Sequence, residues 1–184
     1  MVIKIVQLLM AANILNYQPY LADELDDAAL MIYEACADGP REEPVGLECA
    51  AATVAVWYNE SRYSMYPRHT PGDGWGVGQV LVRERWGNHR LGYGPTPPSV
   101  DVQYNPRIGF RWLVKSFRAK RMKVRTMRSA FRSYNGHPAY KERYATKAIR
   151  IYTRILQEVR DVELPACDSS VRRCVYRVRD IPRT

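Results

Sequence analysis

The chain has 184 residues, 46% of them hydrophobic, and a formal net charge of +9 at pH 7. This length and hydrophobic fraction are typical of a single globular domain with its own core, and they exclude a largely disordered chain. The charge favours an anionic partner and leaves nucleic acid, anionic lipid and bacterial cell wall open. No apolar run approaches the roughly 20 residues of a membrane-spanning helix, so we predict no membrane span.

Residues 1–43 are predicted to form a helical segment packed on the main domain. The stretch 2–15 is mostly apolar, but Gln7 interrupts it and no clean cleavage site follows, which favours a packed helix over a signal peptide. Apolar residues at three- and four-residue spacings predict a second helix over 21–37. The sequence DGPREEP that follows predicts a break, because glycine and proline interrupt helices.

Residues 44–160 are predicted to form the main, mostly helical domain. An uncharged run at 50–59 belongs to a predicted helix over 45–59 and ends at Glu60. Prolines and glycines exclude a long helix at 67–80 and predict a loop or small β element, and a further loop is predicted over 92–106. Three more helices are predicted over 106–122, 126–134 and 139–160. Residues 161–184 are predicted to be a basic tail that forms a short strand, a hairpin or an extended arm.

Cysteine and histidine residues do not form a metal-binding motif. The four cysteines match no common zinc spacing and allow two short-range pairs or four reduced thiols, depending on the redox compartment. The histidines are far apart and form no His-Glu-x-x-His motif. We therefore predict no metal site and no cofactor. The residues concerned are Cys36, Cys49, Cys167, Cys174, His69, His89 and His137.

Residues 102–141 contain many basic residues and no acidic one. Interleaved aromatic residues make a nucleic-acid-binding face one interpretation. However, Phe110, Leu113 and Phe117 fall at helical spacing, which favours aromatic residues in the core and a solvated basic face outside. Such a face suits anionic wall polymers as well as nucleic acid.

Three motifs follow one another around Glu60. Glu60-Ser61 ends the apolar helix, Gly76-Val77-Gly78-Gln79 places Gln79 19 residues later, and Ser133-Tyr134-Asn135-Gly136 comes further on. With the segment NPRIGFRWLVKSF, they resemble the soluble lytic transglycosylase family, which is related to goose-type lysozyme. The resemblance covers residues 45–156 and implies a mainly α, lysozyme-like domain with a loop or small β element in the cleft. Gly78 departs from the family, which usually has methionine there.

The position of Glu60 also makes chemical sense without the family. Burial among apolar side chains, here beside Trp57 and Tyr58, raises the pKa of a carboxyl group toward neutral. A carboxyl group that stays protonated near pH 7 can donate its proton to the leaving oxygen of a glycosidic bond. Glu60 is therefore our candidate catalytic residue.

The resemblance implies cleavage of the β-1,4 bond between N-acetylmuramic acid and N-acetylglucosamine in peptidoglycan. Glu60 would act first as acid and then as base, the N-acetyl group of the sugar would replace a second carboxylate, and a 1,6-anhydro product would form. Family position implies contacts with the substrate for Gln79, Tyr134, Asn135 and Thr70. Ser61 would hold the loop that carries Gln79 against the helix that carries Glu60.

Two alternatives stay open. Asp73 stands 13 residues after Glu60, a spacing at which goose-type lysozymes carry an aspartate. It either activates water, which would make the protein an inverting hydrolase, or it is a turn residue of the Asp-Gly pair. The second alternative is a non-enzymatic virion, secretion-system or nucleic-acid-binding protein. For an enzyme we expect action at the cell wall or in the periplasm, as a phage virion or host-lysis protein or an exported effector.

Overall fold

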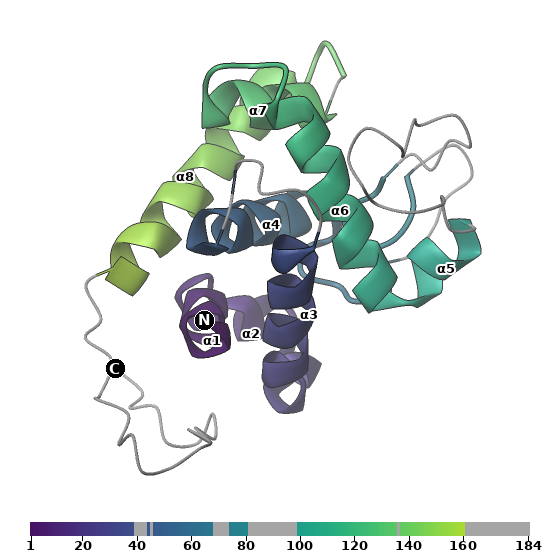
Figure 1. Cartoon of the computed structure of the whole chain (residues 1–184), viewed down its shortest axis with the longest axis vertical. Coiled ribbons are helices and arrows are strands. Elements are labelled where there is room, and N and C mark those ends of the chain that lie inside the picture. The colour runs from purple at the N-terminus through teal and green to yellow at the C-terminus, as the bar shows by residue number, and fades with distance from the viewer. Residues whose placement is uncertain (39–43, 45, 68–73, 81–98, 136, 161–184) are drawn as a thin grey trace.

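The computed structural model describes residues 1–38, 44, 46–67, 74–80, 99–135 and 137–160 (Figure 1). This part of the chain is mainly helical, as predicted. Within these ranges, β structure is limited to one antiparallel bridge between Trp75 and Val80. The predicted small β element is thus a closed loop. Several predicted features lie outside the described residues: Thr70, Asp73, Cys167, Cys174 and the predicted tail.

The N-terminal region is more broken than predicted. It forms α1 (Val2–Ala11), α2 (Ile14–Tyr17), the 3-10 helix η1 (Pro19–Asp23) and α3 (Leu25–Ala37). The helix predicted over 2–15 is interrupted at Asn13, whose φ of 55° is left-handed, a conformation that asparagine tolerates better than most residues. The helix predicted over 21–37 starts late, because the segment that begins at Pro19 forms η1 first.

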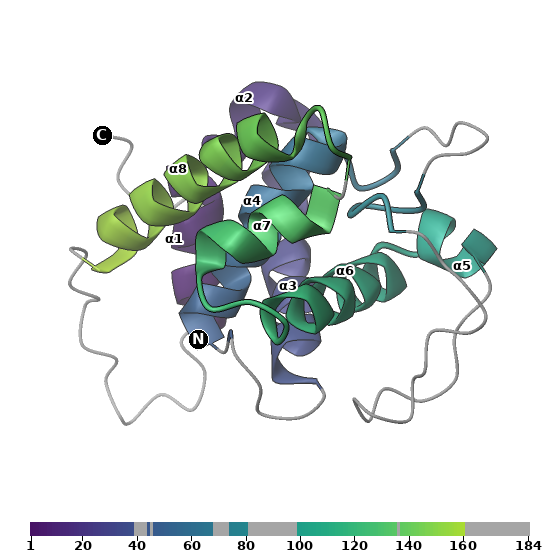
Figure 2. The same cartoon turned by 90° about the horizontal axis from the view of Figure 1, so that it is seen from above.

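The remaining helices are α4 (Gly46–Ser61), α5 (Ser99–Tyr104), α6 (Pro106–Arg121), α7 (Met127–Asn135) and α8 (Lys141–Arg160). Every residue of α4 from Cys49 to Trp57 is buried, as expected of a helix that is apolar all round. The helices α1, α3, α6 and α8 pack against it. Figure 2 shows α7 and α8 side by side in front of α4, and α8 packs against α4.

The prediction of a loop over 92–106 is wrong for α5. Prolines surround this short helix in sequence, so its local signal is that of a loop. Tertiary contacts stabilise it: the Gln103 side chain accepts a hydrogen bond of 2.9 Å from the Gly76 N–H and donates one to the Pro67 carbonyl. A buried amide paired at both ends fixes α5 against the loop 74–80.

The N-terminal helices share one core with the rest of the described chain. Leu8, Leu9 and Ile32 are fully buried in the same cluster as Val54 and Ile155. Residues 2–11 thus form a helix packed into this common core. In the part of the chain that the structure describes, no helix is both long enough and apolar enough to cross a membrane.

The basic segment is not one continuous solvated face, which corrects our interpretation. Arg118 is only 2% exposed and donates to the carbonyls of Cys36, Asp38 and Pro44 at 2.6 to 3.3 Å. The Lys115 ammonium lies 3.6 Å from the ring centre of Trp112 and is also buried. The aromatic residues of α6 lie in the core, as predicted.

A disulfide joins Cys36 at the end of α3 to Cys49 at the start of α4. It spans 13 residues of sequence and lies beside Arg118, whose guanidinium is 3.8 Å from the Cys49 sulfur. Of the two possibilities left by the sequence, pairing therefore holds for these two cysteines. The disulfide and Arg118 together hold the end of α3 beside the start of α4.

Candidate active site

Glu60 lies in the last turn of α4, where the buried part of the helix ends. Burial raises the pKa of its carboxyl group from 4.5 to about 7, the direction that the apolar run predicts. The turn after the helix is fixed by Trp57, whose indole N–H donates to the Ser64 carbonyl at 2.8 Å. The side chain of Glu60 is partly exposed. A substrate can therefore approach a carboxyl group that is half protonated near neutral pH.

Two tyrosines flank Glu60: the partly buried Tyr134, which the sequence motifs predict for the site, and the buried Tyr144, which they do not. Tyr134 comes from α7 and Tyr144 from α8, and their rings stack with centroids 6.5 Å apart. Burial raises the pKa of both hydroxyls well above 10, and the nearby Glu60 carboxylate raises it further. Both hydroxyls therefore stay protonated and can serve as donors.

The Tyr144 hydroxyl interacts with the Glu60 carboxyl group. It partly offsets the effect of burial by lowering the pKa of Glu60, although the contact falls short of regular hydrogen-bond geometry. By regular hydrogen-bond geometry, this buried hydroxyl has no partner among the described residues. Helical spacing with Ala148 and Tyr152 places Tyr144 on the buried side of α8, but only the tertiary structure brings it to Glu60.

The loop 74–80 is closed by the two hydrogen bonds between Trp75 and Val80, of 2.9 and 3.0 Å. Gly76 has a φ of 66°, and a Cβ there would stand 2.2 Å from the Val102 carbonyl oxygen, so this position needs glycine. Gln79 is also left-handed, with a φ of 46°, and its side-chain amide donates to the Gly76 carbonyl at 3.0 Å. These contacts give the loop a defined shape.

Two side chains hold this loop beside the end of α4. The Ser61 hydroxyl is 3.0 Å from the Val77 carbonyl, and the Tyr134 hydroxyl donates to the Gly78 carbonyl at 2.8 Å. The contact made by Ser61 is the one that the resemblance implies for it. The structure thus joins three separate sequence motifs through Glu60-Ser61, Gly78 and Tyr134.

The other predicted site residues that the structure describes form their hydrogen bonds away from Glu60. Gln79 lies in the loop, but its amide is engaged with Gly76. Asn135 ends α7, and its side-chain oxygen accepts a hydrogen bond of 3.3 Å from the His137 N–H. Thr70 and Asp73 lie outside the described residues. Within the described ranges, no three His, Cys, Asp or Glu side chains gather where they could hold a metal ion.

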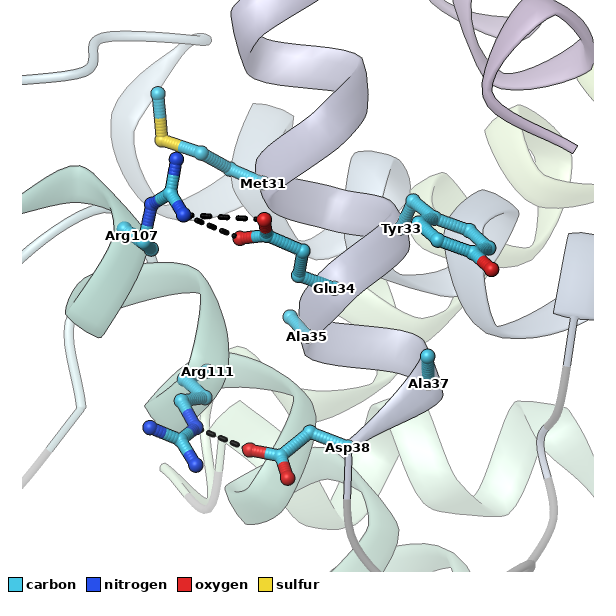
Figure 3. A pocket seen from close by; sticks show the side chains of 8 residues that line it. All are labelled: Met31, Tyr33, Glu34, Ala35, Ala37, Asp38, Arg107 and Arg111. Atoms are coloured by element: carbon cyan, nitrogen blue, oxygen red, sulfur yellow. Dashed lines mark hydrogen bonds and ion pairs between the residues drawn. The ribbon is translucent and has the colours of Figure 1, made fainter.

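A separate pocket of about 470 Å³ lies between α3 and α6 (Figure 3). Four charged side chains line it and pair across it, Arg107 with Glu34 at 2.9 Å and Arg111 with Asp38. None of the site residues around Glu60 lines this pocket. Because its charges neutralise one another, we assign the chemistry to Glu60 and not to this pocket.

Comparison of the chain with models of known families, with curated proteins and with solved structures found no match.

Proposed function

We propose that the protein is a lytic transglycosylase that cleaves the β-1,4 bond between N-acetylmuramic acid and N-acetylglucosamine in peptidoglycan, on a lysozyme-like helical domain. The observation that carries the proposal is the Glu60 carboxyl group, whose pKa is about 7 at the end of a buried helix. The order and contacts of the three motifs around it support the same assignment.

The reaction needs one group that gives a proton and then takes one back. Protonated Glu60 gives its proton to the glycosidic oxygen as the C–O bond breaks, and the N-acetyl oxygen of the muramic acid forms a bond to the anomeric carbon. The 6-hydroxyl of the same sugar then displaces the N-acetyl oxygen, and its proton passes to the Glu60 carboxylate. No water is consumed, and Glu60 ends protonated as it began.

The tyrosines around Glu60 suit this cycle. When Glu60 is ionised between the two steps, the Tyr144 hydroxyl can donate to the carboxylate in a site of low polarity, where such a contact is strong. Tyr134 acts on the loop through Gly78 and so positions the segment that carries Gln79. Ser61 holds the same segment from α4.

The disulfide supports action outside the cytoplasm. Disulfides persist in oxidising compartments and are rare where thiols are kept reduced. The Cys36–Cys49 bond is therefore consistent with work at the cell wall or in the periplasm.

Mass spectrometry of the soluble products from purified peptidoglycan tests the proposal, with wild type and Glu60→Gln in parallel. Glu48→Gln is a matched control, because Glu48 is exposed and lies in the first turn of the same helix. We expect 1,6-anhydro products, one water lighter than hydrolysed ones, from wild type and Glu48→Gln only.

Other product patterns contradict the proposal in different ways. Products with a reducing end would show that water attacks, as in a lysozyme that uses Asp73. No product from wild type would overturn the enzymatic function and favour a binding role on the same fold.

A further inference from the structure

A row of basic side chains runs along the exposed side of α8. Its members are spaced four, three and four residues apart, so they share one face of the helix and span about 16 Å. Arg62, from the turn after α4, lies beside the row near Lys147. We call these residues the basic row: Arg62, Arg143, Lys147, Arg150 and Arg154.

Two members of the basic row, Arg62 and Lys147, contact the aromatic ring of Tyr58. The Arg62 guanidinium carbon and the Lys147 ammonium each lie 4.6 Å from the ring centre of Tyr58. The pKa of Lys147 is lowered, chiefly by burial and then by the like charges of Arg62 and Arg143. Lys147 thus lies close enough to Arg62 and to Arg143 to be repelled by both.

Little negative charge balances the row. Glu158 pairs with Arg154 at 3.8 Å, whereas Glu142 pairs with Arg128 and Arg132 on α7. Among the described residues, no carboxylate forms an ion pair with Arg62, Arg143, Lys147 or Arg150. The first 18 residues contain no acidic residue. They supply α1, which packs against α8 and α4, and α2, whose Tyr17 contacts Tyr58 of α4. Such a concentration of one charge favours an anionic ligand.

The row begins beside the candidate active site. Arg143 directly precedes Tyr144, which faces Glu60, and Arg62 follows Glu60 by two residues. An anionic chain attached to a sugar at Glu60 would therefore meet the row at its start and could follow α8 away from the site. We infer that the basic row binds the carboxylates of the acidic stem peptide of peptidoglycan.

This inference rests on the proposed function and gives it a substrate preference, for glycan that still carries its peptides. An extended peptide of about five residues spans about 16 Å, the length of the row. Exposed arginine and lysine side chains suit carboxylates on successive peptide residues. Nucleic acid is disfavoured because the adjacent Tyr58 ring contacts Arg62, Lys147 and the Tyr17 ring, and so offers no open platform for a base.

Calorimetric titration tests the inference in the Glu60→Gln background, in which the ligand is not cleaved. The ligands are soluble glycan chains with pentapeptide stems and the same chains stripped of stems by an amidase. The test variant is Arg143→Gln/Lys147→Gln. The matched control is Lys123→Gln/Arg125→Gln, which removes the same charge from the exposed turn between α6 and α7.

We expect the test variant to bind stem-bearing chains about five- to thirtyfold more weakly, and stripped chains unchanged. The control should bind both ligands like the parent, and added salt should weaken only the binding of stem-bearing chains. Equal losses for both ligands, a similar loss in the control, or displacement of the stem-bearing chains by single-stranded DNA would overturn the inference. Stem-dependent binding without cleavage by wild type would instead overturn the proposed function alone.

Discussion

The hydroxyl of Tyr134 donates a 2.8 Å hydrogen bond to the carbonyl of Gly78, and this bond ties α7 to the loop that carries Gln79. The approach is possible only because position 78 lacks a side chain. A Cβ there would lie 2.9 Å from the Tyr134 hydroxyl and 2.8 Å from the Cβ and Cγ of Leu113. The glycine that departs from the family motif is thus the residue on which α6, α7 and the loop converge.

Gly78→Ala should therefore damage both stability and activity. The added methyl group must displace Leu113 or Tyr134, and overpacking of this kind costs about 1–3 kcal/mol in the free energy of unfolding. Tyr134→Phe removes only the hydrogen bond and should cost about 1 kcal/mol. Urea denaturation measures both. A Gly78→Ala protein as stable as wild type would show that the loop is not packed as described.

The raised pKa of Glu60 should make stability depend on pH. The folded pKa of about 7 lies above the unfolded value of 4.5, so the folded state holds this proton more tightly. The free energy of unfolding then falls as pH rises from about 4.5 to about 7, and the penalty stays constant above that. Because Glu60→Gln cannot ionise, it should gain about 2–3 kcal/mol relative to wild type between pH 4 and pH 8.

Urea denaturation of wild type and Glu60→Gln at pH 4 and at pH 8 measures this gain. The contributions of other titrating groups cancel when the free energies of unfolding of the two proteins are subtracted. Glu48→Gln should show no such gain. A Glu60→Gln curve parallel to wild type would mean that Glu60 titrates as an ordinary surface glutamate.

The same proton should govern the rate. If cleavage needs protonated Glu60, kcat/KM for soluble glycan should be constant below about pH 7 and fall about tenfold per pH unit above it. Tyr144→Phe removes the hydroxyl that lowers the pKa of Glu60, so its descending limb should move to higher pH. A limb that stays in place would show that Tyr144 does not act on Glu60.

The sequence was sufficient for features that depend on local pattern. The uncharged run before Glu60 predicted both the helix and the raised pKa of Glu60. The part of α4 that is buried on every side, from Cys49 to Trp57, has no charged residue on any face, and this is visible in the sequence alone. The spacing of Phe110, Leu113 and Phe117 likewise predicted their place in the core. Such signals are read within one element.

Features that depend on contacts between distant elements could not be predicted in this way. The helix α5 forms because Gln103 bridges Gly76 and Pro67, and Tyr144 reaches Glu60 only through the packing of α8 on α4. Arg118 has the sequence signature of a surface cation, yet carbonyls from a segment about 80 residues earlier surround it. Net charge therefore overstated the basic surface of α6.

Arg118→Lys should be strongly destabilising, although the substitution keeps the positive charge. The guanidinium donates to three carbonyls in a buried site, and an ammonium group cannot reproduce that planar fork. Leaving buried carbonyls unpaired should cost about 2–4 kcal/mol in the free energy of unfolding. Arg125→Lys, at an exposed position, is the control and should change nothing measurable. Equal stability of the two variants in urea denaturation would contradict the buried arrangement of Arg118.

Reduction of the Cys36–Cys49 disulfide should destabilise the protein further. The bond closes a short loop between α3 and α4 and so limits the unfolded chain, an effect worth about 3 kcal/mol for this loop length. Urea denaturation with and without reductant measures it. The effect of the reductant should persist in Cys167→Ser/Cys174→Ser and vanish in Cys36→Ala/Cys49→Ala, which assigns it to this pair. A reductant effect that vanishes in the first variant instead would place the stabilising bond between the other two cysteines, and core packing and Arg118 would then hold α3 against α4 without a disulfide.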